Sequence, residues 1–422
     1  YHNMPRSEYD EVIRYLSGEY ASLEDRNVYA KIWVDEETQE MGKRGRLARV
    51  IYMTNVGTIP DETNIRVKCN GTKIGSISEP FLEKLKKGDV FVLGGDTYEF
   101  RYGQGATAFA NPAPSRSPTV PSWFSEQLPL SYDLACGIQK FRRYVTDYFE
   151  SDVSKDRVKD FIQDYLYVDE NSTESIYQYF KEQYLFSTVP HDKRVVVEHY
   201  EDEDEKYVIF HMLYGRRVID VISRAAAYKA SKILKRDVGI NINDNGFYLS
   251  IPKSKSLNGV NLIQSILPGE LYEMMKEVLE KTEVLKRRFR HCAARSLMIL
   301  RNYKGNRKSV SRQQLSSRLL ISAVRRIDKE FIILKEARRE VLKDLMDIDH
   351  AREVLQGIQN ESIHVSETYT DIPSPFAFNL VSMGYGDVMK MEDKQQFLQR
   401  MHQYVLAKIG EDNSEVPGVK ES

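Results

Sequence analysis

The sequence predicts an α+β fold in which a β-barrel-like module precedes a large, mostly α-helical domain that contains a four-stranded ββαββ sheet. Three observations support this prediction. Short β-type runs separated by Gly, Asn, Asp and Pro fill residues 47–112. Apolar residues recur at helical spacing through much of residues 129–410. A proline-rich stretch separates the two regions, and a hydrophobic content of 41% in 422 residues is sufficient for packed cores.

The first predicted element is a helix over residues 7–17. Ser7 provides an N-cap, acidic residues follow it, and Gly18 ends the helix. The period then changes, and seven runs predict the strands of a small antiparallel barrel or curled sheet, with one short helix over residues 80–87. These runs are VYAKIWV, RLARVIYMT, NIRVKCN, KIGSIS, DVFVLGG, TYEFRYG and ATAFANP.

Residues 113–128 are predicted to be a semi-rigid linker. The stretch NPAPSRSPTVPS holds four prolines and no acidic residue, a composition typical of extended segments. We therefore place the main domain boundary here.

The helical domain is predicted to enclose a sheet at residues 193–252. RVVVEHY and YVIFHML form one hairpin, a long helix follows, and VGININ and FYLSIP form a second hairpin with Asn245-Gly246 at its turn. The rest of the chain is predicted to be helical to about residue 360. After a Pro-containing segment, a last helix covers residues 390–409, and residues 411–422 form a disordered tail.

The most distinctive stretch is the basic segment, residues 281–327. It holds fourteen Lys or Arg and one acid, Glu283, so its net charge is +13 in a chain whose formal total is −1. Apolar residues recur near helical spacing, whereas Arg288, His291 and Arg295 follow one another on another side. The segment is therefore predicted to form two basic amphipathic helices, broken at residues 302–309, that bind a nucleic-acid backbone.

Other interpretations of this charge are a solvated structural face, a surface for an acidic protein, or a membrane surface. A membrane is the weakest of these, because no apolar run of roughly 18 residues occurs in the sequence. The cysteines Cys69, Cys136 and Cys292 lie far apart and suggest neither a disulfide framework nor a CxxC metal site. We therefore expect a cytoplasmic protein without a metal site.

Catalytic motifs are scarce. The sequence holds no G-x-x-x-x-G-K-[ST] phosphate loop, so we expect no cofactor in this chain and no nucleotide-driven motor of that kind. Its eight histidines show neither HExxH nor another metal-ligand spacing. Asp349-His350 on a helical stretch fits a surface position better than a catalytic one.

Two single residues are candidates for contact with bases. Ile59 lies between Thr58 and Pro60 in a polar loop, where it either plugs the end of the sheet or acts as an apolar wedge that unstacks a duplex. Trp123 follows four prolines and either pins the linker to a domain or stacks on a base.

Several separated motifs resemble one protein family. VPSWFSEQLPLSYDLACGIQKFR, LYGRRVIDVISRA, FRHCAARSLMILRNYKG, SVSRQQLSSRLL and EARREVLKDLMDIDHAREVL are similar, in this order, to segments that follow the motor in the large helicase-related (Lhr) family of superfamily 2 helicases. GTIPD and GDVFVLGGDTYEF resemble the sheet module of the same family. The resemblance covers about residues 7–380.

The resemblance implies a longer protein in which two upstream RecA-like motor domains bind ATP and Mg²⁺ and drive 3′-to-5′ movement on DNA. It implies that residues 1–46 are the end of a winged-helix domain, and that partners include single-stranded DNA or RNA and RNA:DNA hybrids. Both motor domains are absent here, and the missing initiator Met favours a fragment.

We expect this chain to form one wall of the channel for a single strand. Two other functions remain open: a nucleic-acid-processing enzyme such as a glycosylase, in which a carboxylate near the basic groove activates water, and a stand-alone nucleic-acid-binding adaptor. The residues predicted to bind nucleic acid are Ile59, Trp123, Arg216, Arg217, Arg287, Arg288, Arg295, Arg301, Lys304, Arg307 and Lys308.

Overall fold

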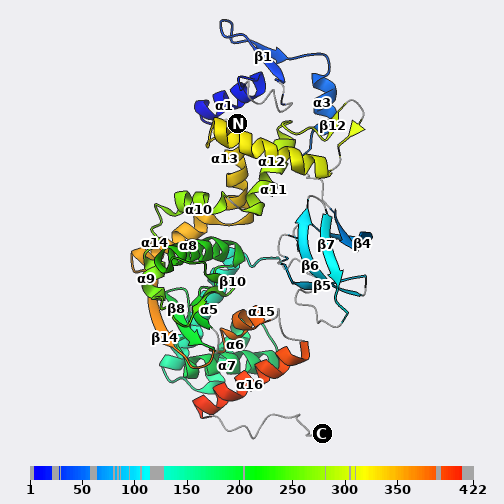
Figure 1. The fold of residues 1–422 in the computed structure, drawn as a ribbon. Coiled ribbons are helices and arrows are strands. Elements are labelled where there is room, and N and C mark those ends of the chain that lie inside the picture. Colours follow the sequence, from blue (N-terminus) through cyan, green and yellow to red (C-terminus); the bar gives the residue numbers. More distant parts are fainter. Residues whose placement is uncertain are drawn as a thin grey trace. The chain divides into compact units, whose positions relative to one another are not determined.

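The computed structural model is an α+β fold, as predicted, and its chain divides into two units (Figure 1). Unit 1 combines Tyr1–Phe124 with Leu279–Leu345, and unit 2 combines Ser125–Val278 with Met346–Ser422. This division places the basic segment with the N-terminal part of the chain, whereas the predicted boundaries assign it to the domain at residues 129–410. The residues described are 4–20, 28, 30–57, 64–78, 81–82, 85, 87–94, 96–104, 107–114, 128–202, 205–280, 282–303, 306–308, 310–385 and 391–410.

Unit 1 contains a small N-terminal layer, a sheet and the helices of the basic segment. Its first elements are α1 (Arg6–Ser17), β1 (Ile32–Val34), β2 (Met41–Lys43) and α3 (Ala48–Asn55), and its sheet strands are β3 (Asn64–Cys69), β4 (Thr72–Ser78), β5 (Val90–Leu93), β6 (Asp96–Gln104) and β7 (Thr107–Pro112). Its later elements are α11 (Glu283–Arg295), β12 (Asn302–Tyr303), β13 (Asn306–Arg307), α12 (Val310–Ile327), α13 (Ile332–Arg339) and the π-helix η1 (Glu340–Leu345).

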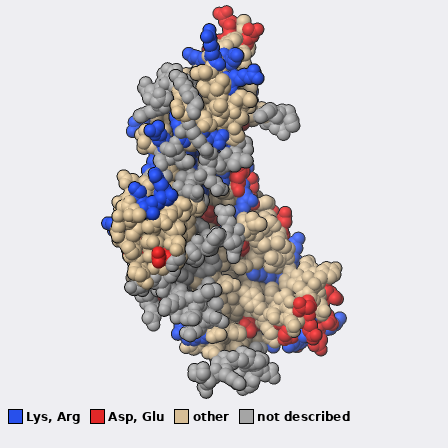
Figure 2. Space-filling model, turned by 90° about the vertical axis from the view of Figure 1, so that its right-hand side faces the viewer, with Lys and Arg blue, Asp and Glu red and all other residues tan. Residues whose placement is uncertain are grey.

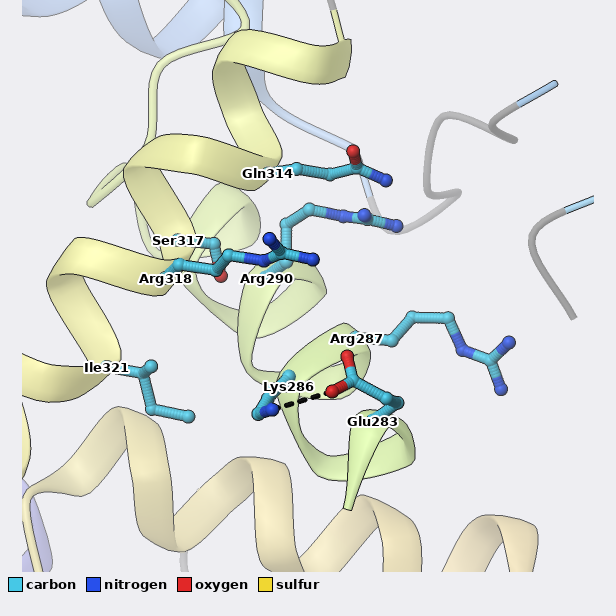
Figure 3. A pocket seen from close by; sticks show the side chains of 8 residues that line it. All are labelled: Glu283, Lys286, Arg287, Arg290, Gln314, Ser317, Arg318 and Ile321. Atoms are coloured by element: carbon cyan, nitrogen blue, oxygen red, sulfur yellow. Dashed lines mark hydrogen bonds and ion pairs between the residues drawn. The ribbon is translucent and has the colours of Figure 1, made fainter. Parts of the chain in front are cut away.

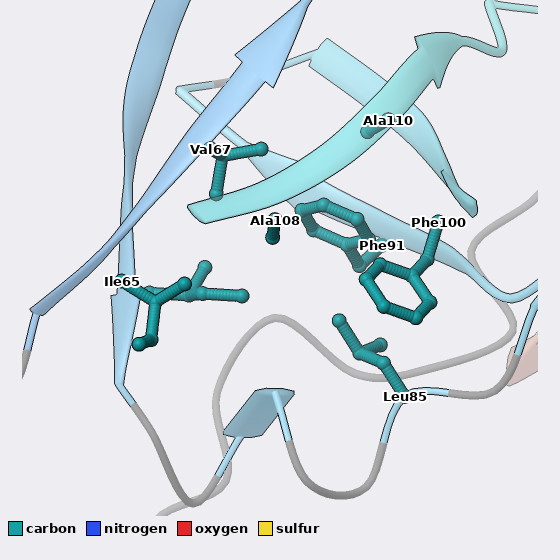
Figure 4. Packing of buried hydrophobic residues seen from close by; sticks show 8 residues of the cluster. Ile65, Val67, Leu85, Phe91, Phe100, Ala108 and Ala110 are labelled. Atoms are coloured by element: carbon teal, nitrogen blue, oxygen red, sulfur yellow. The ribbon is translucent and has the colours of Figure 1, made fainter. Parts of the chain in front are cut away.

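The five strands β3 to β7 form one sheet in the order β4-β3-β7-β6-β5. Neighbours are antiparallel except β3 and β7, which run parallel. Ile65, Val67, Phe91 and Phe100 meet in its core, where alternating side chains of each strand point to one face (Figure 4). Among the described residues β4 and β5 are the edges of the sheet, so the barrel-like closure that the sequence suggests is not confirmed.

One strand prediction in unit 1 is wrong. The run RLARVIYMT was predicted to be a strand, but residues 48–55 form α3. The hydroxyl of Thr54 donates a hydrogen bond to the carbonyl of Val50 at 2.8 Å, and the side-chain amide of Asn55 donates to the carbonyl of Ile51 at 2.9 Å. Asn55 also bonds residues of the basic segment, and this distant contact overrides the β propensity of Val, Ile and Tyr.

Unit 2 is built from helices around a second sheet. Its elements are α5 (Tyr132–Glu150), α6 (Lys155–Leu166), α7 (Glu170–Phe186), β8 (Arg194–Glu201), β9 (Glu205–His211), α8 (Arg216–Leu234), β10 (Gly239–Asn243), β11 (Gly246–Pro252), α9 (Gly259–Gln264), α10 (Leu271–Leu279), α14 (Ile348–Gln359), β14 (His364–Tyr369), α15 (Phe378–Tyr385) and α16 (Met391–Ile409). The two predicted hairpins and the helix between them occur in the predicted order.

The sheet of unit 2 has five strands, in the order β10-β11-β9-β8-β14, so the prediction of a four-stranded sheet is not confirmed. The additional strand β14 pairs in parallel with β8. Buried Glu198 on β8 accepts hydrogen bonds from the hydroxyls of Ser374 at 2.6 Å and Thr370 at 3.0 Å, and from the ring of His211 at 2.7 Å. These bonds attach the chain after β14 to the sheet and satisfy the buried carboxylate.

Candidate nucleic-acid interface

The basic segment forms the two helices that its periodicity predicts, α11 and α12, with the short hairpin β12–β13 between them (Figure 1). Thr282 caps α11, its hydroxyl accepting a hydrogen bond from the backbone of Leu285 at 3.3 Å. Leu285, Phe289 and Cys292 are buried along one face of this helix. The basic residues are thereby divided between the flanks of α11.

One flank of α11 faces η1, and its arginines are paired with acid. Arg295 forms an ion pair with the buried carboxylate of Glu340, and Arg288 lies 3.7 Å from the same carboxylate. Cys292 lies beside this pair, and burial raises the pKa of its thiol to about 12. The predicted contact residues Arg288 and Arg295 therefore stabilise the packing of α11 against η1.

A second group of ion pairs connects α12 and α13 to Glu280, the residue directly before the basic segment. The guanidinium of Arg338 is buried and pairs with Glu280, and Arg325 lies 2.9 Å from the same carboxylate. Glu280 and Glu340 both lie outside residues 281–327. Acids that the segment itself lacks are thus supplied by its neighbours in the fold.

The other flank of α11 and the facing side of α12 line a small, partly open polar cavity of about 40 Å³ (Figure 3). Because about 10–15 Å³ of such volume holds one water molecule, this cavity has room for roughly three waters. Its polar lining is Glu283, Lys286, Arg287, Arg290, Gln314, Ser317 and Arg318.

The charge around this cavity is mostly positive. Figure 3 shows the side chains of Arg287, Arg290 and Arg318 on the same side of the two helices, with the amide of Gln314 beside them. Arg290 is only 6% exposed. The carboxylate of Glu283 is 2.6 Å from the ammonium of Lys286, which neutralises it. Guanidinium groups beside a polar cavity are suited to bind a phosphate oxygen.

The hairpin β12–β13 is attached to α3 through what we call the Asn55–Asn302 clamp. The side-chain amide of Asn55 donates to the carbonyl of Asn302 at 3.0 Å, and the side-chain oxygen of Asn55 accepts from the backbone N–H of Asn302 at 2.8 Å. The amide of Asn302 donates in turn to the carbonyl of Thr54 at 2.7 Å. The predicted contact residue Arg301 donates to the carbonyl of Asn55 at 2.8 Å and so is part of the attachment.

The remaining predicted contact residues are dispersed. Arg216 and Arg217 begin α8 in unit 2, where the backbone N–H of Arg216 donates to Asp244 at 2.7 Å and the guanidinium of Arg217 donates to the carbonyl of Met346 at 3.2 Å. Lys308 is half-buried after β13. Ile59, Trp123 and Lys304 lie outside the described residues, and of Arg307 only the backbone is described.

Of the residues that line the cavity, only Arg287 was among the predicted contact residues, and the missed ones include Arg290, Gln314 and Arg318. Arg287 and Arg290 lie three residues apart in α11, and Gln314 and Arg318 lie four residues apart in α12. Each pair therefore lies on one side of its helix. This spacing is visible in the sequence. The pairing of the two helix faces is not, because it depends on how α12 returns against α11.

The described residues hold no group of three or more His, Cys, Asp or Glu side chains arranged to bind a metal ion. No helix in the same part of the chain has the length and apolar character needed to cross a membrane. Lys and Arg side chains gather on the upper part of the surface in Figure 2, at the level where Figure 1 draws α1, α3 and α12 of unit 1.

Two family models match the chain. Residues 1–120 match the model described as large helicase-related protein, winged helix domain, and residues 189–377 match the model described as DEAD/H associated. The first of these extends beyond the predicted winged-helix limit at residue 46.

Similar proteins carry related names. The chain is 50% identical to the ATP-dependent helicase Lhr-Core of Methanothermobacter thermautotrophicus over 97% of this chain and 47% of that protein, and 42% identical to the Lhr-Core of Saccharolobus solfataricus over 96% and 47%. It is 25% identical to the Lhr helicase/uracil glycosylase of Escherichia coli over 91% of this chain and 25% of that protein. The chain thus spans about half the length of the Lhr-Core relatives.

A solved structure has a related fold. The Mycobacterium smegmatis helicase Lhr, determined bound to single-stranded DNA and AMP-PNP, aligns with a TM-score of 0.63 and 22% identity over 90% of this chain and 43% of that one. The two family models and the Lhr-Core relatives show that the chain belongs to the large helicase-related family.

Proposed function

We propose that this chain is the nucleic-acid-binding region of an ATP-dependent, 3′-to-5′ Lhr-type helicase and forms part of the channel for the single strand. The observation that carries the proposal is the cavity between α11 and α12, which Arg287, Arg290 and Arg318 line. Phosphate contacts of this kind supply affinity without reading sequence, as a translocating protein requires.

The family relationship supports the rest of the proposal. ATP and Mg²⁺ are held by RecA-like motor domains that act together with this chain, and the substrates are single-stranded DNA or RNA and RNA:DNA hybrids in the cytoplasm. The relatives named ATP-dependent helicase are about twice as long as this chain, which leaves room for such domains. DNA repair is the process in which we expect such a helicase to act.

Binding by the 422-residue chain tests the proposal. A fluorescent single-stranded oligonucleotide is titrated with the chain at several salt concentrations, for the unchanged chain and for the double variant Arg287→Ala/Arg318→Ala. We expect affinity to fall about tenfold and the slope of log K against log[salt] to become shallower by about 0.7, the value for one lost single-strand phosphate contact.

The matched control is Arg224→Ala/Arg339→Ala, which removes two positive charges that are paired with acids elsewhere, Arg224 with Asp220 and Arg339 with Glu336. It should bind as the unchanged chain does. Equal affinity and slope in the Arg287/Arg318 variant would refute the cavity as a phosphate site. Reversal of Arg288 and Arg295 is less informative, because both contact buried Glu340 and their loss would also disturb folding.

A further inference from the structure

Helix α3 has an unusual surface, because most of its apolar side chains are exposed. Leu47, at its N-cap, Val50 and Met53 follow one another three residues apart along one side, and Val50 and Met53 are 55% and 65% exposed. Tyr52 and Val56 are exposed nearby. Apolar residues of a surface helix normally face the core, and their burial fixes the position of the helix. The apolar stripe of α3 is exposed, so it cannot fix the position of α3 in this way.

The Asn55–Asn302 clamp fixes it instead. Asn55 is fully buried although its neighbours are exposed, and its side chain bonds both the N–H and the carbonyl of Asn302, as a paired strand would. Arg301 adds a bond to the backbone of Asn55. Hydrogen bonds are directional, so α3 has one defined orientation relative to the hairpin β12–β13 and hence to the helices that line the phosphate cavity.

The exposed apolar stripe is bordered by positive charge. Arg44, Arg46 and Arg49 are exposed just before and within α3, and the hairpin of the basic segment lies at its other end (Figure 1). Contiguous exposed apolar side chains mark interaction sites. An exposed apolar stripe with cations beside it matches the end of a nucleic-acid duplex, where a base pair presents its face between two phosphate backbones.

We propose that α3 binds the junction between duplex and single strand, with Val50 and Met53 against the terminal base pair, and that the Asn55–Asn302 clamp positions α3 beside the path of the single strand. The proposal rests on the proposed function, since the single strand that leaves the junction enters the phosphate cavity. In this arrangement Arg44 and Arg46, which precede α3, bind the phosphate backbone of the duplex.

The test compares a forked DNA with a single strand of the same sequence. The fork carries a fluorescent base analogue in the terminal pair of its duplex, whose emission rises when that base loses its stacking. With the unchanged 422-residue chain we expect tighter binding to the fork than to the single strand and a rise in emission. In Val50→Ser/Met53→Ser we expect the preference for the fork to fall about tenfold and the rise to disappear.

Two further variants make the outcome specific. Ile233→Ser removes an apolar side chain that is 61% exposed on α8 and should change neither signal. Asn55→Asp removes the amide that donates to Asn302, and it should lose the fork preference while single-strand affinity stays within twofold of the unchanged chain, by our estimate. A general loss of folding would lower both affinities together.

The outcomes separate the two proposals. If the unchanged chain binds the single strand but shows no preference for the fork, or if Val50→Ser/Met53→Ser keeps the preference and the emission rise, the junction proposal is refuted and the proposed function stands. If the unchanged chain binds neither DNA, the proposed function fails and the junction proposal fails with it.

Discussion

Two adjacent arginines on α13 have opposite environments. Arg338 has a side chain that is 3% exposed, pairs with Glu280 and donates to the carbonyl of Lys329 at 2.7 Å, whereas the side chain of Arg339 is 44% exposed beside Glu336. A buried, hydrogen-bonded cation that is removed leaves its partners unsatisfied, but an exposed pair contributes little.

We therefore expect Arg338→Ala to lower the free energy of unfolding by about 2–3 kcal/mol and Arg339→Ala by less than about 0.5 kcal/mol. Urea denaturation of the two variants, followed by circular dichroism, measures both values. Similar losses in the two variants would mean that Arg338 is not a structural residue of unit 1.

The same contrast explains what the sequence could reveal about the candidate site. The net charge of residues 281–327 correctly identified where cations gather. It could not separate Arg288 and Arg295 from Arg287, since their partner Glu340 lies far along the chain and its position depends on the packing of η1. Arg290 and Arg318 were missed for the same reason, because a cavity between two helices is a property of their packing.

At the scale of single elements, two glycines differ in the space that the fold leaves for a side chain. Gly246 is the first residue of β11, directly after the turn residue Asn245, with a φ of +156°, and a Cβ at this position would overlap the carbonyl oxygen of Phe210. Gly137, inside α5, has nothing within 4 Å of such a Cβ.

Gly246→Ala should therefore destabilise the chain by about 1–3 kcal/mol, whereas Gly137→Ala should stabilise it by about 0.5–1 kcal/mol, because alanine is the better helix residue. Thermal unfolding of both variants shows whether the melting temperature moves in opposite directions. A shift of the same sign in both would contradict the described turn.

The contact between α6 and α7 depends on pH. Hydrogen bonds from Lys155 and Lys159 lower the pKa of Glu174 from 4.5 to about 2. A carboxyl group whose pKa is lower in the folded state stabilises the fold above its unfolded value, and this stabilisation is lost as pH falls from about 4.5 to about 2.

Because Glu174 is more than a third exposed, the contribution near neutral pH is at most about 1 kcal/mol. Glu174→Gln should be destabilised by this amount near neutral pH and match the unchanged chain at about pH 2. Chemical denaturation at both pH values tests this, with Glu150→Gln at the exposed end of α5 as control. A difference that persists in acid would assign the effect to packing instead of charge.

Elements with local signals were predicted well, and those fixed by distant partners were not. Strands β3 to β7 and helices α5 to α8 follow their periodicity. The helix α3 was predicted as a strand, since its clamp partner Asn302 is 247 residues away. Strand β14 was missed because it pairs with β8, about 170 residues earlier, and its own sequence has no strong strand pattern.

At the scale of the whole molecule, the chain passes between the two units three times. Unit 1 is made of two separated stretches, and its α1 depends on the second one: the hydroxyl of Tyr15 donates to the carbonyl of Ser296 at 2.9 Å, and its ring contacts Phe331. The proline-rich stretch that the sequence offers as the boundary is only the first of the three crossings. The other two have no signal in composition, because one falls at the end of α10 and the other directly after η1.

A fragment that begins at residue 128 should consequently contain a damaged unit 1. We expect amide hydrogens of α11 to α13 to exchange faster in this fragment than in the full chain, because Phe331 loses Tyr15, whereas those of β8 to β11 should remain protected. Hydrogen exchange with mass spectrometry measures both regions in one experiment. Equal protection of α11 in fragment and full chain would show that residues 129–410 fold independently, as the sequence suggests.

The interleaving of the two units also determines the order of events on the ribosome. Tyr15 cannot meet Phe331, nor Asn55 meet Asn302, until the second stretch of unit 1 has been synthesised, and these partners lie 316 and 247 residues apart along the chain. At about 5–20 residues per second this is a delay of roughly 12–65 s. During that time the exposed apolar stripe of α3 has no clamp, so nascent chains are the species in which we expect chaperones to be needed.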